Sequence, residues 1–146
     1  MKQLIFLSIV SLLLASCDAK PEAINYGSDA CHFCEMTIVD KQHASQIVTS
    51  KGKAYKFDAI ECMAQSIQDE FKDTEMAHYL VTNLDQPGEL IDAKTASYLV
   101  SEKLRSPMGA NLSAFKNEDA ANEAQVKFTG KTYSWAEMQQ HINSRN

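Results

Sequence analysis

The sequence lacks a clustered basic patch and has only one long apolar run. Nineteen Asp and Glu residues against 14 Lys and Arg give a formal net charge of −5, and the basic residues are spread along the chain. Because nucleic-acid binding requires a concentrated positive surface, this distribution argues against a nucleic-acid partner. No segment after the first apolar run is long enough to span a bilayer. The remaining length suits one small domain or two very small ones.

The single apolar run, Leu4–Leu14, is too short for a transmembrane helix but suits the core of a signal peptide. It ends in LASC, which resembles the lipobox of bacterial lipoproteins, where the chain is cut before the cysteine and lipid is attached to it. We therefore predict a lipoprotein signal peptide over residues 1–16, lipidation of Cys17 and a flexible, lipid-anchored tether over residues 17–29. These features place the protein at the periplasmic face of a bacterial membrane, with inner and outer membrane both open.

Cysteine is scarce as well. Besides Cys17 the chain has Cys31, Cys34 and Cys62. An odd number of thiols in an oxidising compartment leaves at least one unpaired unless it binds something. The chain has no second CxxC pair and no HxxxH pair, one of which a zinc knuckle would require. Zinc is therefore less favoured, and the segment CHFCEM, residues 31–36, is better explained as a short disulfide, a redox pair or a site for a softer metal.

Sulfur donors of two kinds favour the metal site. Cys34 and Met36 are two residues apart, so an extended segment would place both side chains on one face. A thiolate with a thioether favours Cu(I), whereas zinc sites very rarely use methionine. Met108 lies in the SPMG segment, away from any apolar stripe, so core filling explains it less well than usual. Cys31 would add a third sulfur from across a turn.

Two further side chains are weaker ligand candidates. Cys62 falls nearly opposite the apolar stripe of a predicted helix, in its first turn, where the helix dipole lowers the pKa of a thiol. It is therefore either exposed and reactive or an accessory ligand, if that end of the helix faces the motif. His32 could supply an imidazole. The other histidines, His43, His78 and His141, have no spacing partner and are expected to be surface or hydrogen-bonded side chains.

The apolar pattern predicts an α+β fold in which each half reads strand, strand, helix, strand. The first unit, residues 30–86, carries the CxxCxM motif; the second, residues 87–146, carries the PMG loop. The expected elements of the first unit are strands over 44–49 and 53–57, a helix over 59–71 and a strand over 77–84. Those of the second are strands over 97–101 and 111–115, a helix over 118–127, an extended segment over 131–133 and a helix over 134–142. The expected helix caps are Asp58 with Glu61, then Asn117, then Ser134 with Glu137.

Several separated motifs point to one family. They are the lipobox and tether, D-x-C-x-F-C-x-M-x-I, F-D-x-I-x-C-M at the start of a helix, P-M-G-x-x-L-x-A-F, and a closing S-W-x-E. Together they resemble the NosL family, accessory lipoproteins of nitrous oxide reductase. The resemblance covers essentially the whole mature chain and implies two small ββαβ units in tandem. By position it implies Cu(I) ligands at Cys34, Met36 and Met108. The extra Cys31 departs from many members of the family.

The resemblance also implies a function, namely a Cu(I) chaperone rather than an enzyme. It implies delivery of copper by ligand exchange for assembly of nitrous oxide reductase in denitrification, together with a membrane ABC-type maturation complex. Two alternatives stay open. One is a thiol–disulfide oxidoreductase that uses Cys31 and Cys34, and the other is a binding module in which these residues form a structural disulfide.

Overall fold

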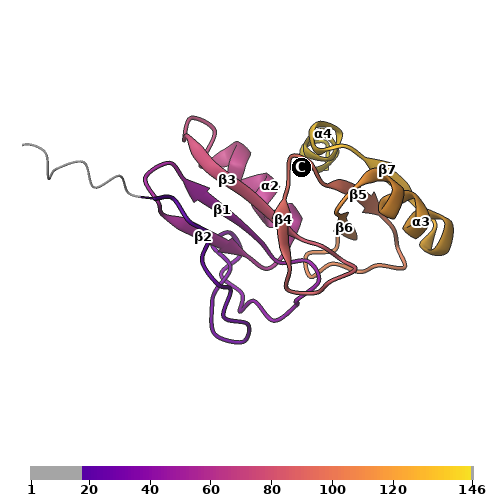
Figure 1. Ribbon diagram of the computed structural model, residues 1–146, viewed down its shortest axis with the longest axis horizontal. Helices are drawn as coiled ribbons and strands as arrows, with labels where there is room; N and C mark the ends of the chain where they lie inside the picture. The colour runs from indigo at the N-terminus through magenta and orange to yellow at the C-terminus, as the bar shows by residue number, and fades with distance from the viewer. Residues whose placement is uncertain (1–17, 146) are drawn as a thin grey trace, which may run out of the picture.

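The computed structural model describes residues 18–145, which form two antiparallel sheets of four and three strands (Figure 1). In the first sheet α2 packs against β1 and β2, and the second sheet packs against α3 and α4. The elements are β1 (Ser45–Thr49), β2 (Ala54–Phe57), α2 (Ile60–Asp69), β3 (Met76–Thr82), β4 (Leu90–Asp92), β5 (Ser97–Val100), β6 (Leu112–Phe115), α3 (Glu118–Phe128), β7 (Lys131–Tyr133) and α4 (Trp135–Asn143). The predicted signal peptide and Cys17 lie outside the described residues.

The two sheets repeat one topology. Their strand orders are β2-β1-β3-β4 and β6-β5-β7, so the first strand of each unit lies between its second and third strands. The predicted tandem of ββαβ units is confirmed. The sequence did not predict β4, which pairs with β3 and extends the first sheet beyond the expected seam at residues 86 and 87. With three residues, β4 is too short to show an alternating pattern.

Two of the three predicted helix caps are confirmed. Asn117 accepts a hydrogen bond from the backbone N–H of Ala120, and Ser134 with Glu137 forms a capping box. The predicted pair at α2, Asp58 with Glu61, is wrong. The N-cap of α2 is Ala59, whose side chain offers no cap. Both carboxylates are instead buried and bonded to groups elsewhere in the fold, described below.

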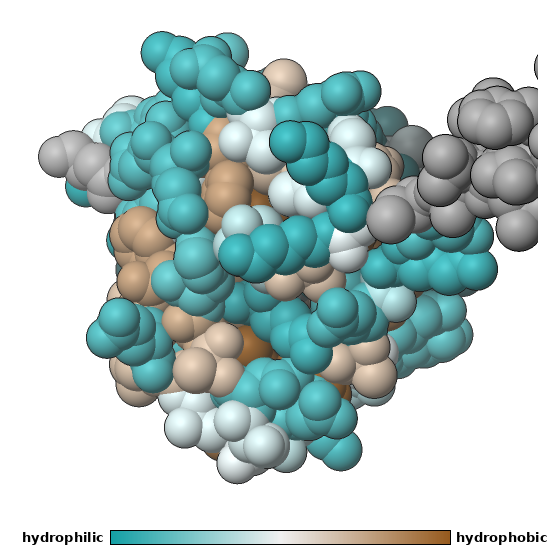
Figure 2. Space-filling model, turned by 90° about the vertical axis from the view of Figure 1, so that its left-hand side faces the viewer, coloured by the Kyte–Doolittle hydropathy of each residue, from teal (hydrophilic) through white to brown (hydrophobic). Residues whose placement is uncertain are grey.

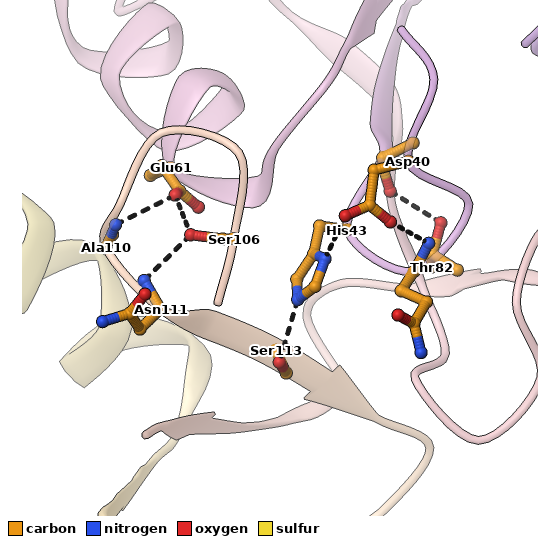
Figure 3. A network of polar contacts seen from close by, with 10 residues as sticks. Asp40, His43, Glu61, Thr82, Ser106, Ala110, Asn111 and Ser113 are labelled. Carbon is orange, nitrogen blue, oxygen red and sulfur yellow. Dashed lines mark hydrogen bonds and ion pairs between the residues drawn. The ribbon is translucent and has the colours of Figure 1, made fainter. Parts of the chain in front are cut away.

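One apolar core joins the two units. Buried side chains from both sheets and from α2 and α4 form a single cluster; among its largest members are Ile47, Met63, Tyr98, Leu112, Met138 and Ile142. His43 adds a buried polar link: its ring nitrogens lie 2.9 Å from Asp40 Oδ2 and 3.2 Å from Ser113 Oγ on β6 (Figure 3). His43 is thus a hydrogen-bonded side chain, one of the two roles expected for it.

The segment predicted as a tether lies against the first sheet. The Glu22 backbone exchanges two hydrogen bonds with the Gln46 side chain, of 2.9 and 2.8 Å, and Lys56 Nζ lies 2.8 Å from Asp29. On the face that Figure 2 shows, hydrophilic residues predominate and apolar residues show only in small separate areas. Among the residues described, no helix is long and apolar enough to cross a membrane.

Candidate metal centre

The CHFCEM segment forms a tight loop. The Cys31 N–H donates to the Met36 carbonyl at 2.8 Å, and the Glu35 N–H donates to the Cys31 carbonyl at 3.0 Å. Glu35 has φ 63°, in the left-handed region that lets the chain reverse direction. The expectation of an extended segment at Cys34–Met36 is therefore wrong. Cys34 is partly buried against the core, whereas Met36 is 57% exposed.

This loop places two thiols against the start of α2. Cys31 and Cys34 meet Asp58 and Cys62, and the four possible ligand atoms all lie within 4.8 Å of one another. We call these four residues the thiol cluster. Asp58 lies just before the N-cap of α2, and Cys62 lies in the first turn of the helix, where its thiol donates to Asp58 Oδ1. Cys62 is fully buried, so of the two positions expected for it, the exposed one is wrong and the one beside the motif is observed.

Asp58 accepts hydrogen bonds from two of the thiols. Its Oδ1 lies 3.2 Å from Cys62 Sγ and 3.6 Å from Cys34 Sγ. The carboxylate is only 3% exposed. The sequence assigned Asp58 to helix capping and so missed it as a site residue. Its place just before the helix that carries Cys62 was the only local signal that pointed to it.

The three thiols differ in pKa. A hydrogen bond from Cys62 is the main cause that lowers the pKa of Cys31 to about 6. Burial raises the pKa of Cys34 to about 11. The pKa of Cys62 is also raised, first because its thiol donates to Cys31 and then because it is buried. The Cys62 thiol has a single proton, so Cys31 and Asp58 compete for it. The lowered pKa of Cys31 favours its thiolate, whereas the raised pKa values of Cys34 and Cys62 favour their protonated forms.

The remaining predicted ligands lie nearer the surface. Met108 is 41% exposed in the loop between β5 and β6, and Met36 is more exposed still. His32 Nε2 lies 2.8 Å from Glu70 Oε2, at the far end of α2 from Cys62. Its ring packs against Tyr55 at a centroid distance of 4.6 Å. Ligation by these three residues stays a prediction, and His32 already has a carboxylate partner.

The cluster and the fold define a class of protein. Cys31, Cys34 and Cys62 are all free thiols, and thiolates select soft or borderline ions such as Cu(I) and Zn²⁺. A small α+β protein that brings three free thiols together beside a carboxylate, two of them buried, has the donor set of a site for a thiophilic metal ion.

Comparison with known proteins identifies the family. The chain belongs to the NosL family, whose model matches residues 23–143. Over 124 residues it is 29% identical to the copper-binding lipoprotein NosL of Stutzerimonas stutzeri. The matched region covers 80% of this chain and 65% of that protein. The chain thus spans slightly less than two thirds of that relative's length.

A solved structure shows the same fold. The crystal structure of the copper chaperone NosL from Shewanella denitrificans superposes with a TM-score of 0.71 at 19% sequence identity, covering 82% of this chain and 96% of that one. The family resemblance and the fold class predicted from the sequence are both confirmed.

Proposed function

We propose that this chain is a Cu(I) chaperone that binds the ion at the thiol cluster and passes it on by ligand exchange. The observation that carries the proposal is the meeting of three free thiols within 4.8 Å, two of them buried. The family supports it, since the two relatives are named a copper-binding lipoprotein and a copper chaperone. Copper is the cargo here, and the protein's own chemistry is to hold it and release it.

The exposure of the sulfur donors suggests a direction of transfer. Cys31 and Cys62 are almost inaccessible, Cys34 is partly exposed, and Met36 is more than half exposed. Thioethers are neutral, soft ligands, and they bind Cu(I) more strongly than they bind harder ions. We propose that the acceptor's ligands replace those of this chain from the surface inward, so that copper is never released into water.

The same exposures argue against the oxidoreductase alternative. Disulfide exchange needs a thiolate that a substrate disulfide can reach. Cys31 has the lowered pKa but is 1% exposed, whereas the more accessible Cys34 has a raised pKa. The activated thiol is thus shielded and the accessible one is not activated. The disulfide-module alternative conflicts with the free state of all three thiols in the structure.

We further propose that lipid on Cys17 anchors the chain at the periplasmic face of a bacterial membrane. There it would supply Cu(I) for the assembly of nitrous oxide reductase, together with a membrane ABC-type complex. The LASC sequence and the lipoprotein relative support the anchor. The recipient and the complex rest on the family resemblance alone. Radiolabelled palmitate incorporation into the full chain, compared with the Cys17→Ser variant, tests the anchor: equal labelling of the two would contradict it.

A competition titration tests copper binding itself. The full chain, reduced and in detergent, should take one Cu(I) from a colorimetric Cu(I) chelator, and excess Zn²⁺ should not displace it. Cys34→Ser should weaken binding at least ~10-fold, because a hydroxyl is a poor ligand for a soft ion. Met108→Leu should weaken it less, and Met76→Leu is the matched control, a methionine outside the predicted ligand set. If Cys34→Ser and Met108→Leu both bind like wild type, the ligand assignment fails.

A further inference from the structure

The loop that carries Met108 is held at both sides of this residue by one carboxylate oxygen. The Ser106 hydroxyl, two residues before Met108, donates to Glu61 Oε1 (Figure 3). The Ala110 N–H, two residues after it, donates to the same oxygen at 3.2 Å. The Asn111 N–H donates to Ser106 Oγ at 2.8 Å and closes the loop. Glu61 therefore fixes the backbone on either side of the thioether.

Glu61 is an unusual residue for this position. It is 3% exposed, and its second oxygen, Oε2, is buried without a hydrogen-bond partner among the described residues. A glutamate is almost never buried unless it is paired, because the charge loses its hydration. Its bonds to Ser106 and Ala110 are charge-assisted when it is ionised and are then about twice as strong as neutral ones. Glu61 and Met108 also line one cavity of about 180 Å³.

The position of Glu61 in α2 connects the loop to the thiol cluster. Glu61 immediately precedes Cys62, in the first turn of the helix. Successive helical residues point about 100° apart, so Cys62 can face the thiols while Glu61 faces the Met108 loop. Because both residues share one rigid turn of backbone, a loop bonded to Glu61 keeps a fixed position relative to the Cys62 thiol. The loop itself comes from the other unit, between β5 and β6.

We propose that Glu61 is a positioning residue, which holds the Met108 thioether at a set place relative to the thiol cluster so that both serve one Cu(I). This inference rests on the proposed function. Its competitor is a purely structural role, in which Glu61 only fastens a loop and copper binding does not depend on it. The two differ in one respect: a positioning residue acts on copper only through Met108.

A double-mutant cycle separates these roles. Cu(I) affinity is measured by chelator competition for the full chain and for Glu61→Ala, Met108→Leu and the double variant. Glu61→Ala should weaken binding several-fold, but no more than Met108→Leu does, because it acts only through the thioether. In the Met108→Leu background the same change should have almost no effect. Glu61→Gln should retain most of the affinity, because its amide oxygen can accept from the same two donors.

Two further variants keep the test decisive. Asn117→Ala removes the cap of α3, outside the thiol cluster and the Met108 loop, and should lower the melting temperature while leaving affinity unchanged. Ser106→Ala loosens the same loop and replaces Glu61→Ala if that variant does not fold. Sulfur counts from X-ray absorption should fall by one in Glu61→Ala, as in Met108→Leu.

The outcomes that overturn the proposal are distinct. Wild-type affinity in Glu61→Ala, or equal losses in both backgrounds of the cycle, would refute the positioning role while Cu(I) binding by the chain stands. Wild-type affinity in Met108→Leu would also refute it, because Glu61 would then have no ligand to position. If the reduced wild-type chain takes up no Cu(I), the proposed function fails first and the inference falls with it.

Discussion

At the scale of single residues, the thiol cluster is set up to exchange protons for a metal. Only Cys31 has a lowered pKa, of about 6, so near neutral pH it is the thiolate, and Cys34 and Cys62 stay protonated. A metal ion must displace the protons of the other thiols that it binds. The carboxylate of Asp58 lies within hydrogen-bonding reach of both these thiols.

This arrangement predicts how copper affinity depends on pH. Protons compete with Cu(I) for sulfur, so affinity should fall as pH falls. Below about pH 6 the affinity should fall more steeply with pH. Cys31 is then protonated in the free protein, so each copper ion that binds must displace about one more proton. Chelator competition between pH 5 and 8 measures this slope. Cys31→Ser should remove the break near pH 6, and a break that persists in that variant would assign it to another group.

At the scale of elements, the start of α2 carries two functions at once. Asp58 and Cys62 belong to the thiol cluster, and Glu61 holds the Met108 loop. Sequence reasoning read Asp58 and Glu61 as a capping pair because their spacing fits that pattern. At Ser134 and Glu137 the same pattern is a real capping box. The difference lies in burial: Glu137 is exposed, whereas Asp58 and Glu61 are buried and find partners from distant parts of the chain.

The end of α3 offers a sharp test of the fold. Gly130 has φ +113°, and a Cβ there would lie 2.1 Å from the Val100 carbonyl oxygen. Gly130→Ala should therefore destabilise the protein by more than the ~1 kcal/mol that a left-handed residue alone costs. Gly88→Ala is the matched control, since Gly88 has φ +88° but nothing within 4 Å of its Cβ position. Urea unfolding compares the two; equal losses of stability would contradict this close packing of α3 and β5.

At the scale of the whole molecule, two similar units share one core. Trp135, the only tryptophan, opens α4 in the second unit, and its ring centroid lies 5.6 Å from Tyr79 on β3 and 6.2 Å from Tyr98 on β5. Ile142, on the same helix, is 1% exposed within the common cluster. The units therefore support each other through α4 and should not be stable separately.

Unfolding should accordingly be a single transition. Trp135 fluorescence, which reports on the contact between units, and far-ultraviolet circular dichroism, which reports on all elements, should give the same urea midpoint. Ile142→Ala should lower both midpoints together and cost about 2–5 kcal/mol, as is typical for a buried isoleucine. Two separate midpoints would show that the units fold independently.

Local patterns in the sequence were sufficient for the repeated order of strands and helix along the chain and for two helix caps, because these depend on residues close together in the chain. They also indicated Cys34 as a site residue. They could not show that Glu35 turns the chain, nor that Cys62 is buried against Cys31. Both depend on how the loop at residues 31–36 packs on α2, a contact between segments that no local period encodes.

The most direct test of the central claim is the copper K-edge X-ray absorption spectrum of the reduced full chain loaded with one equivalent of Cu(I). Binding at the thiol cluster with help from methionine predicts a copper ion surrounded by two to four sulfur atoms and no nitrogen, because His32 has Glu70 as its partner. The number of sulfur atoms should fall in Cys34→Ser. A first shell made mainly of nitrogen or oxygen, or a chain that retains no copper, would contradict the account.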